Sequence, residues 1–563
     1  MLPDKWGQGQ IFAFSALDGD SFVSDDLCGT LTGDRIGVRF RLKVKRELAF
    51  VNLPAGPFFD VVSSDWIVCR FSEEEKLKLV FVRRNLIIGQ TAGGAYASVF
   101  TEGAHALMTE NGCEIQDTGN GEFTCIKRAG EKFAFSFAHS RADAVRLAEE
   151  GIGMDIGAEE MKKLAYFEKH ALSDGVPYSK LYSKCLSVMK TQLYSPEAEF
   201  KTIWSTPDRA PHRHLWLWDS VFHAIGHRHL SVSVAQNLIR AIWAHQNADG
   251  FVPHMADIGM ASDIIQPPVI AWGVRKVYEM SKDKAFLKEV FDNNSRFLKW
   301  CRENRRKSGK ELYTWATTID VNCRCDECGM DNSPRFDITH ELFAIDFTCF
   351  MANDIRHMAA IAEELGLAEE KRFYEAWYEL IRRDANEYLW SEEDGFYFDY
   401  DIEDKKLHKV WAVASFLPLF SGLCSENQAE KLVRHLSDPE SFYTEMPVPS
   451  ISKKDATFGT DMWRGPVWIN YNVMIAEGLA AYGENAFSEE IIDKTVFHMN
   501  KWYEETGTIY EFYDSESMKV PKVLNRKGEV FEPYNYDIKI QSIRDYGWSC
   551  TLLCDILKRK YEA

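Results

Sequence analysis

The spacing of the apolar residues changes once along the chain, near residue 140, and this change constrains the fold more than any other feature. Before it, Val38, Phe40, Leu42 and Val44 alternate with arginine and lysine, which is the period-two pattern of a half-buried strand. Similar strand-like runs recur at 76–82, 122–127 and 132–138. Because such short runs must pair to bury their apolar faces, residues 1–140 are predicted to form a β-sandwich domain.

Beyond residue 140 the apolar residues follow the period of helices. Residues 142–172 are rich in alanine, glutamate, lysine and leucine, and a helical linker is predicted over 141–175. Helices are then predicted around 234–243 and over 267–280, 284–304, 343–365, 368–389, 427–436, 470–482, 488–506 and 548–561. Successive helices joined by loops rich in unusual residues predict a mostly α chain, in which a helical toroid over 176–563 carries the function.

The charge balance excludes two classes of partner. The 66 basic and 85 acidic residues give a net charge of −19, which opposes binding to nucleic acid and to anionic membranes. The first residues lack the apolar core of a signal peptide, and the apolar stretch 410–424 is too short to span a bilayer. Thirteen cysteines without framework spacing fit free thiols, so a cytoplasmic protein is predicted.

One turn-forming stretch, residues 327–337, carries the strongest chemical signal. Asp331 lies in a run of glycine, asparagine, serine and proline, and a carboxylate on such a turn can project into a cleft. Apolar neighbours such as Met330 are expected to raise its pKa, so that it keeps a proton near neutral pH and acts as an acid. A helix start is the competing and compatible interpretation, with Asn332 or Ser333 as the cap and Pro334 in the first turn.

Three other segments combine indoles with carboxylates, as sugar-binding pockets do. In the first, Trp216 or Trp218 could stack on a pyranose while Asp219 accepts hydrogen bonds from its hydroxyls, although Asp219 could equally be a helix cap. The second, residues 458–470, and the third, residues 508–514, contribute the candidate residues Asp461, Trp463, Arg464, Trp468 and Glu511.

No cofactor or metal is predicted. Cys323, Cys325 and Cys328 are close in sequence, but no fourth zinc ligand is apparent. His223 and His227 have helical i, i+4 spacing without the glutamate of a His-Glu-x-x-His motif, so structural or substrate-bonding histidines are favoured. Glycine-rich phosphate loops and the Gly-x-Ser-x-Gly elbow are also missing from the sequence.

Taken in order, six motifs resemble those of glycoside hydrolase family 63, and together they span nearly all of residues 176–563. They are Trp218-Asp219-Ser220, Gln266-Pro267-Pro268, residues 329–335 (GMDNSPR), residues 461–468 (DMWRGPVW), residues 510–514 (YEFYD) and Gly547-Trp548-Ser549. That family includes processing α-glucosidases and the mannosylglycerate and glucosylglycerate hydrolases, and it is related to the trehalases.

The resemblance implies an (α/α)6 barrel and an inverting mechanism, with Asp331 as general acid and Glu511 as general base. Asp219 would hold the sugar where the bond breaks. Gln266, Arg335, Asp461, Trp463, Arg464 and Trp468 would shape the pocket, with Trp548 in its wall. Two features depart from the family, the Cys323–Cys328 cluster and a long connection over 515–545, and both are expected to border the leaving-group side.

These observations lead to an exo-acting α-glycosidase of a small glucoside or mannoside, such as a disaccharide or a glyceric acid glycoside. A disaccharide phosphorylase, a sugar epimerase and a non-catalytic sugar-binding protein stay open as alternatives, because a fold does not determine chemistry. The predicted partner is a small carbohydrate, and the sequence sets neither the glycone nor the oligomeric state.

Overall fold

The N-terminal part of the chain forms two antiparallel sheets. In this computed structural model, residues 1–33, 35–101, 107–110, 112–320, 323–338, 340–528 and 541–562 are described. Within them, the five-stranded sheet has the order β1 (Ile11–Phe12), β2 (Gly29–Leu31), β3 (Gly37–Phe40), β4 (Arg46–Val51) and β9 (Tyr96–Thr101). The eight-stranded sheet has the order β10 (Leu107–Glu110), β11 (Cys113–Asp117), β12 (Phe123–Ala129), β13 (Lys132–Ala138), β8 (Leu86–Gln90), β7 (Lys76–Arg83), β6 (Trp66–Arg70) and β5 (Phe58–Val62).

The two sheets pack face to face around an aromatic core. The ring of Phe40 stacks on that of Phe135 from the other sheet, with centroids 5.3 Å apart, and Phe12 lies 4.9 Å from Phe81. The strand predicted over 35–45 ends earlier than expected, because Phe40 pairs with Arg46 and the residues between them form the turn of a hairpin. The alternation of apolar and charged residues continues through the turn at 41–45, so the pattern alone did not show where the strand ends.

Three helices lead from the sheets to the rest of the chain. The single helix predicted over 142–172 is two helices, α1 (Arg141–Ile152) and α2 (Ile156–His170), because Gly153 ends the first and the Asp155 side chain caps the second. Helix α1 packs on β12 and β13. Helix α3 (Ser179–Thr191), which was not predicted, is buried along most of its length and packs against the last helix of the chain.

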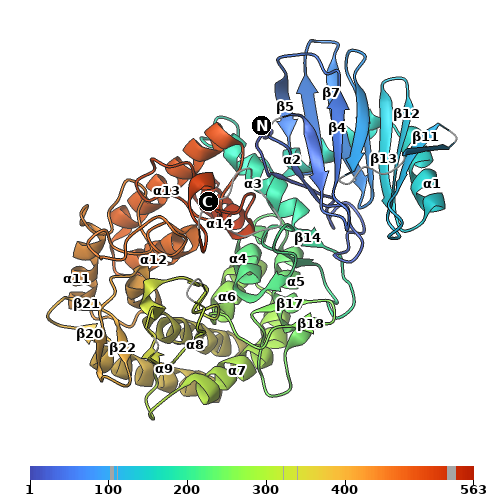
Figure 1. Cartoon of the computed structure of the whole chain (residues 1–563). Coiled ribbons are helices and arrows are strands. Elements are labelled where there is room, and N and C mark those ends of the chain that lie inside the picture. The colour runs from blue at the N-terminus through green and yellow to red at the C-terminus, as the bar shows by residue number, and fades with distance from the viewer. Residues whose placement is uncertain are drawn as a thin grey trace.

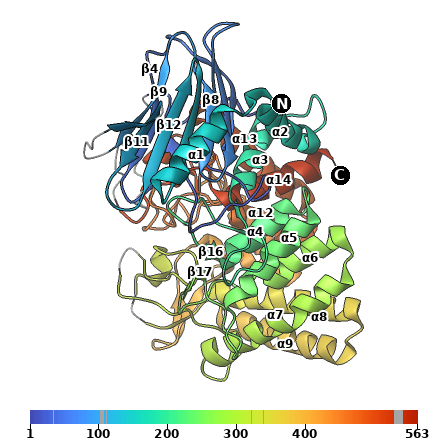
Figure 2. The same ribbon diagram turned by 90° about the vertical axis from the view of Figure 1, so that its right-hand side faces the viewer.

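Six helices contact one another in a closed ring (Figure 1). In order they are α4 (Leu217–His227), α6 (Ile270–Ser281), α8 (Ile345–Leu365), α10 (Leu417–Ser421), α12 (Ile469–Ala481) and α14 (Gly547–Tyr561), and α14 returns to α4. Outside this ring lie α5 (Val232–Ile242), α7 (Lys284–Arg305), α9 (Ala368–Tyr388), α11 (Glu426–Leu436) and α13 (Asn485–Thr506). Figure 2 shows the same ring from its edge, with the sheets at one side.

The predicted helices of this region are confirmed within a few residues, because each has a long apolar stripe that packs on its neighbours. The loops between them carry short strands: β14 (Leu193–Tyr194), β15 (Trp204–Ser205), β16 (Leu215–Trp216), β17 (Met255–Asp257), β18 (Met260–Ala261), β19 (Leu342–Phe343), β20 (Trp390–Ser391), β21 (Phe396–Tyr397), β22 (Asp399–Asp401) and β23 (Lys406–His408). They also carry 3-10 turns at η1 (Trp243–His245), η2 (Pro334–Phe336), η3 (Val413–Phe416) and η4 (Pro521–Val523). Among the described residues, no helix combines the length and apolarity needed to cross a membrane.

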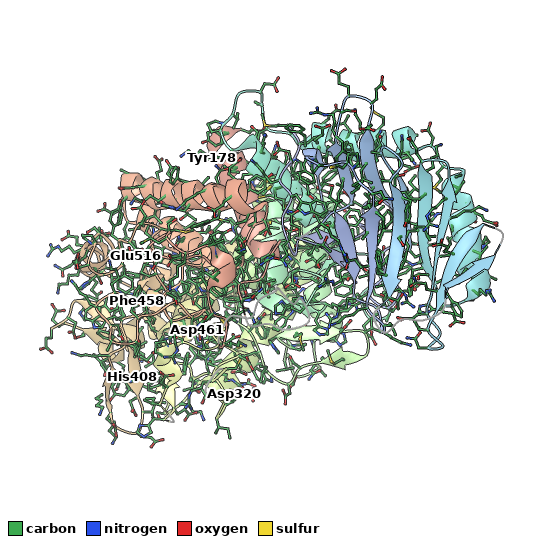
Figure 3. The ribbon with its side chains drawn as sticks, turned by 45° about the horizontal axis from the view of Figure 1, so that its top comes forward. Tyr178, Asp320, His408, Phe458, Asp461 and Glu516 are labelled. Atoms are coloured by element: carbon green, nitrogen blue, oxygen red, sulfur yellow. The ribbon has the colours of Figure 1, made fainter. Side chains whose placement is uncertain are left out.

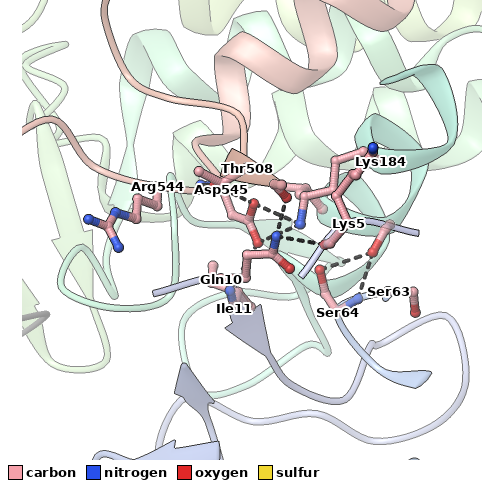
Figure 4. A network of polar contacts seen from close by, with 12 residues as sticks. Lys5, Gln10, Ile11, Ser63, Ser64, Lys184, Thr508, Arg544 and Asp545 are labelled. Carbon is pink, nitrogen blue, oxygen red and sulfur yellow. Dashed lines mark hydrogen bonds and ion pairs between the residues drawn. The ribbon is translucent and has the colours of Figure 1, made fainter. Parts of the chain in front are cut away.

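A buried carboxylate joins the sheets to the ring (Figure 4). Asp545 accepts hydrogen bonds from the amide of Ile11 and from the hydroxyl of Thr508, each at 2.9 Å, and pairs with the ammonium of Lys184 at 2.8 Å. These partners come from a strand, a loop before Glu511 and helix α3, so one side chain fixes three distant segments. Asp545 directly precedes Tyr546 and α14, which reach the pocket described next.

Candidate active site

One pocket of about 500 Å³ opens among the loops of the ring, and eight of the predicted site residues line it. They are Trp216, Trp218, Asp219, Gln266, Asp331, Trp468, Glu511 and Trp548. They come from segments more than 330 residues apart in the sequence, so the ring of helices, not local sequence, brings them together. Asp320, which also lines the pocket, and Asp461 are labelled among the loops of this region in Figure 3.

The turn that carries Asp331 is anchored in the interior by Glu327. This fully buried carboxylate pairs with Arg305 at 2.6 Å and accepts hydrogen bonds from the amides of Ile265 and Ala316. Gly329 then adopts φ +71°, and a Cβ atom there would come within 2.4 Å of the Trp218 ring. Only glycine fits both the left-handed backbone and this close approach. The turn therefore lies directly on an indole of the pocket wall.

A charged side chain contacts the Asp331 carboxylate. The Lys527 ammonium lies 2.5 Å from Asp331 Oδ2, 2.8 Å from Cys323 Sγ and 3.9 Å from Asp326 Oδ1. An ion pair therefore holds the Asp331 carboxylate in place at the pocket lining, and its role as an acid stays a prediction. The helix-start interpretation also holds in part, because η2 begins after Ser333 with Pro334 in its first turn, without a side-chain cap.

Glu511 is held by an arginine of the same connection. Arg526 donates to both carboxylate oxygens, at 2.8 and 3.1 Å, and the amide of Ile543 approaches one of them at 3.4 Å. Glu511 is buried, with 2% of its surface exposed. A bidentate guanidinium pair of this kind fixes the orientation of a carboxylate, which a positioned general base requires.

Asp219 lies in the first turn of α4, whose N-cap position is occupied by Trp216, so Asp219 is not the cap. Burial raises the pKa of Asp219 well above its usual value, and the charge of Glu511 raises it further. Its Oδ1 atom is buried and accepts no hydrogen bond from any residue that the structure describes. An oxygen in this state is available to a sugar hydroxyl.

Three indoles form the aromatic wall. The rings of Trp218 and Trp548 meet edge to face with centroids 5.2 Å apart, and Trp468 lies 5.7 Å from Trp548. Gln266 accepts a hydrogen bond from the amide of Trp218 at 3.0 Å, which fixes the start of α4. Such a wall suits the apolar face of a pyranose ring.

Four residues predicted to bind substrate lie behind the pocket lining. Arg335 is buried and forms paired hydrogen bonds with Asp346 and Asp399 at 2.6 to 2.9 Å, because an interior guanidinium needs carboxylates around it. Trp463 stacks on Trp468, with centroids 3.9 Å apart and planes 2° from parallel. The structure therefore gives Arg335 and Trp463 supporting positions instead of contact with the pocket.

The other two residues hold the loops together. Arg464 donates to the carbonyl oxygen of Asn332 at 2.9 Å and pairs with Asp337, so it ties the 461–468 segment to the Asp331 turn. Asp461 accepts a hydrogen bond from the amide of Lys527 at 2.9 Å. Both act on the pocket through the residues that they position.

Metal-binding groups converge at one point of the pocket. Cys323, Asp326 and Asp331 bring three potential ligand atoms within 4.8 Å of one another, around the position of the Lys527 ammonium. Cys325 and Cys328 are instead buried under the turn, where the Cys328 thiol donates to the carbonyl of Cys325. Burial lowers the pKa of His223 to about 3 and that of His227 to about 4, so these histidines are neutral core residues.

Sequence reasoning missed Arg526 and Lys527, which are the cationic partners of the two candidate catalytic acids. No motif marks them, and the only signal was the unusual length of the 515–545 connection, of which residues 529–540 lie outside the described residues. His212, His254 and Tyr546 also line the pocket and were not selected. Tyr546 directly precedes the Gly547-Trp548-Ser549 motif and His212 lies four residues before Trp216, so their closeness to these motifs is the signal that could have found them.

Comparison with known proteins identifies related sequences. The sequence profile of the mannosylglycerate hydrolase MGH1-like glycoside hydrolase domain matches residues 212–549. An uncharacterised protein of Borreliella burgdorferi is 26% identical over 46% of this chain and 52% of its own length. The mannosylglycerate hydrolase of Thermus thermophilus is 24% identical over 51% of this chain and 86% of its own. The chain thus spans about half of the first relative and most of the second.

Solved structures share the fold. A glycoside hydrolase family 63 mannosylglycerate hydrolase from Thermus thermophilus, in complex with Tris, superposes with a TM-score of 0.54 at 22% identity, over 67% of this chain and 99% of that one. Another structure of that enzyme is in complex with Tris and D-glycerate. A bacterial glucoamylase in complex with acarbose gives a TM-score of 0.60 at 11% identity, over 100% of this chain and 99% of that one.

Proposed function

Because this chain belongs to the mannosylglycerate hydrolase MGH1-like members of glycoside hydrolase family 63, we propose that it is an inverting, exo-acting α-glycosidase of a small glucoside or mannoside. The observation that carries this proposal is that Asp331 and Glu511 line one pocket with four indoles and the buried Asp219. Membership of a hydrolase family supports hydrolysis over the phosphorylase, epimerase and binding-protein alternatives.

In this proposal Asp331 protonates the glycosidic oxygen and Glu511 activates the attacking water from the opposite face of the sugar. Inversion requires about 6.5–9.5 Å between two such carboxyl groups, which leaves room for the water. Arg526 holds Glu511 in a fixed orientation through two hydrogen bonds, as the base of this reaction must be held. Asp219, with its buried Oδ1, holds a hydroxyl of the sugar whose bond is cleaved.

The closed ring of contacts from α4 to α14 and back supports an (α/α)6 barrel as the catalytic domain over residues 176–563. Residues 1–140 form the sheet domain and residues 141–175 the linker in this proposal. In such a barrel the inner helices surround one axis, so the loops at one end of them lie close together. This arrangement accounts for a pocket built from segments that are distant in the sequence.

The mannosylglycerate hydrolases among the relatives support a glycerate glycoside as the substrate class. Two glycosides of glycerate, mannosylglycerate and glucosylglycerate, are the first candidates, and the disaccharides trehalose, kojibiose, nigerose and sucrose complete the panel. Proton NMR during hydrolysis of the accepted α-glycoside tests the mechanism, because inversion releases the β-anomer first. An α-anomer as the first product would contradict inversion, and no sugar released from any member of the panel would contradict the glycosidase itself.

A further inference from the structure

Two backbone runs that carry pocket residues, 508–513 and 541–546, are paired with each other. Within this pairing the amide of Glu511 donates to the carbonyl oxygen of Ile543 at 2.9 Å. Glu511 lines the pocket from the first run, and Tyr546 lines it from the second. Any contact that fixes the paired runs therefore fixes the candidate base on one of them and an aromatic ring of the pocket on the other.

Asp545 joins the two runs and is itself fully buried (Figure 4). The Thr508 hydroxyl donates to its Oδ1 atom at 2.9 Å, and the Asp545 amide donates back to the Thr508 hydroxyl at 3.1 Å. Asp545 adopts φ +51°, a backbone conformation that is uncommon outside glycine. Such a conformation persists only where the surrounding contacts over-determine it. The reciprocal pair is therefore a fixed point beside the pocket.

The same carboxylate is also held from outside the ring of helices. Its Oδ2 atom accepts a hydrogen bond from the amide of Ile11, where β1 begins, and another from the Lys184 ammonium of α3, each at 2.9 Å. Removing either charge of a buried pair is costly, so Lys184 keeps Asp545 in this position. The five-stranded sheet and α3 thus locate Asp545, and Asp545 in turn locates Thr508.

The segment before β1 also contacts the start of the first run directly. The side chain of Gln10 donates to the carbonyl oxygen of Gly507. Gly7 lies so close to the same region that a Cβ atom there would come within 2.1 Å of the Thr506 carbonyl oxygen. The N-terminal part of the chain therefore packs against the backbone that leads into Glu511.

We propose that Asp545 is a positioning residue for the candidate base: through Thr508 it holds the run that carries Glu511, and the sheets hold Asp545. This inference rests on the proposed role of Glu511 as the general base. Arg526 orients the side chain of Glu511, whereas the Asp545 contacts place the backbone from which that side chain extends. A displacement of about 1 Å there would move the attacking water relative to the sugar, which costs up to about 10²-fold in rate. The N-terminal sheets therefore contribute to catalysis through the position of Glu511.

Thr508→Val tests the inference, because valine has nearly the shape of threonine but cannot donate to Asp545. We expect kcat to fall about 10–100-fold while KM stays within about twofold of wild type, because the residues that contact the sugar remain in place. Thr508→Ser keeps the hydroxyl, and it should restore kcat to within about threefold of the wild-type value. An unchanged kcat in the folded valine variant would overturn the inference.

Thr495→Val is the matched control. The hydroxyl of Thr495, buried on α13, donates to the carbonyl oxygen of Ile491 at 2.7 Å and accepts from the Asn472 amide at 2.9 Å, and Thr495 does not line the pocket. This variant loses a buried hydroxyl of the same kind, but it should keep the wild-type kcat. An equal loss of kcat in the two valine variants would assign the effect to a general loosening of the fold and would overturn the inference.

Gln10→Leu acts from the other side of the contact, because it removes the hydrogen bond to Gly507 without changing the run that carries Glu511. It should lower kcat at least about threefold, with KM again near the wild-type value. Thermal unfolding checks the folding of each variant, and Gln10→Leu carries the test if Thr508→Val does not fold. A wild-type kcat in folded Gln10→Leu would refute the contribution of the sheets.

A glycosyl fluoride separates an effect on the base from an effect on the acid. Fluoride leaves without being protonated, so hydrolysis of an α-glycosyl fluoride needs the general base but not the general acid. Thr508→Val should therefore slow the α-fluoride of the accepted sugar by the same factor as the ordinary glycoside, whereas Asp331→Asn should slow the fluoride much less than the glycoside. Cleavage of the fluoride by Thr508→Val at the wild-type rate would overturn the role of Asp545.

Hydrogen exchange reads the contact without any substrate. Mass spectrometry of peptides that cover 508–513 and 541–546 should show exchange at least about tenfold faster in Thr508→Val than in wild type, because the pairing opens locally more often. Unchanged exchange of both peptides would overturn the inference. A wild type that cleaves neither glycosides nor fluorides would refute the proposed function and with it Glu511 as the base, whereas an active wild type with a fully active Thr508→Val would refute only the role of Asp545.

Discussion

Arg526 donates hydrogen bonds to both carboxylate oxygens of Glu511. Both side chains are almost completely buried, with 5% of Arg526 and 2% of Glu511 exposed. A buried charge is tolerated only with its counter-charge, so the pair is a structural unit as well as an orienting device. Because Arg526 lies fifteen residues beyond Glu511, the connection that follows the candidate base returns to hold it.

Replacing Arg526 tests this unit. Arg526→Met should destabilise the fold by about 3–5 kcal/mol, because it leaves the Glu511 carboxylate buried without a partner. Arg526→Lys, which keeps the charge but not the two parallel hydrogen bonds, should lose less stability while lowering kcat. Urea unfolding and initial rates measure the two effects. Equal stability of the methionine variant and wild type would show that Glu511 does not depend on this contact.

Replacing either candidate catalytic carboxyl group should lower kcat, whereas replacing a surface carboxyl group should not. Asp331→Asn and Glu511→Gln should each lower kcat by about 10²–10⁴-fold, the usual contribution of a general acid or base. Glu516→Gln serves as the control, because Glu516 lies on the same connection, pairs with Lys453 at 3.0 Å and is 40% exposed. It should keep wild-type rates. A normal rate in either of the first two variants would remove that residue from the mechanism.

Gly329 should be intolerant of any side chain. Gly329→Ala combines φ +71° with a contact of 2.4 Å to Trp218, and we expect a loss of about 2–4 kcal/mol of unfolding free energy and a raised KM. Gly309 has φ +69°, and no atom lies within 4 Å of the position that a Cβ would occupy there, so Gly309→Ala measures the backbone strain alone. The difference between the variants isolates the contact with Trp218. Identical losses would show that the turn can move away from the indole.

Arg335 should behave as a structural residue. Arg335→Met leaves Asp346 and Asp399 without their buried partner, and about 3–5 kcal/mol of stability should be lost. Arg464→Met removes a pair that is 25% exposed on the arginine side, and its cost should stay below about 1 kcal/mol. Chemical denaturation gives both numbers. If Arg335→Met raised KM without lowering stability, Arg335 would be a substrate-binding residue after all.

Buried histidines should make the fold sensitive to acid. The pKa of His227 is about 4 in the folded protein against 6.5 ordinarily, so the unfolded chain binds a proton that the folded state refuses. Stability is therefore fully present above pH 6.5 and is lost as the pH falls toward 4, by about 1.4 kcal/mol for each unit of pKa difference. His227→Gln should flatten unfolding free energy against pH in that window. An unchanged slope would place the acid sensitivity elsewhere.

His340 provides the control of opposite sign. Its pKa is raised by a hydrogen bond to Asp401, so its contribution to stability is present below the unfolded pKa and is lost as the pH rises through the raised value. His340→Gln should therefore leave the acid limb of the stability curve as it is in wild type. A change in that limb would mean that the two histidines are not independent.

The sequence was sufficient for most helices of the ring region but not for the ion pairs between them. Helix α7 was predicted from its apolar stripe to within one residue, because burying that stripe depends on local spacing. Arg335 was assigned to the pocket through the family resemblance. Its carboxylate partners follow it by 11 and 64 residues, a pairing that no local pattern shows. Lys527 was missed for the same reason, since its partner Asp331 lies 196 residues before it, on a different loop of the ring.

The contact between α4 and α14 sets an order of assembly during protein synthesis. Trp218 and Trp548 touch, but 330 residues separate them, so a nascent chain that has made the first indole must wait for most of the remaining domain before the second emerges. Contacts this distant form late, because the loop between them must be closed first. Until residue 548 has been synthesised, the nascent chain lacks part of the pocket wall. The complete pocket can therefore form only after translation has passed residue 548.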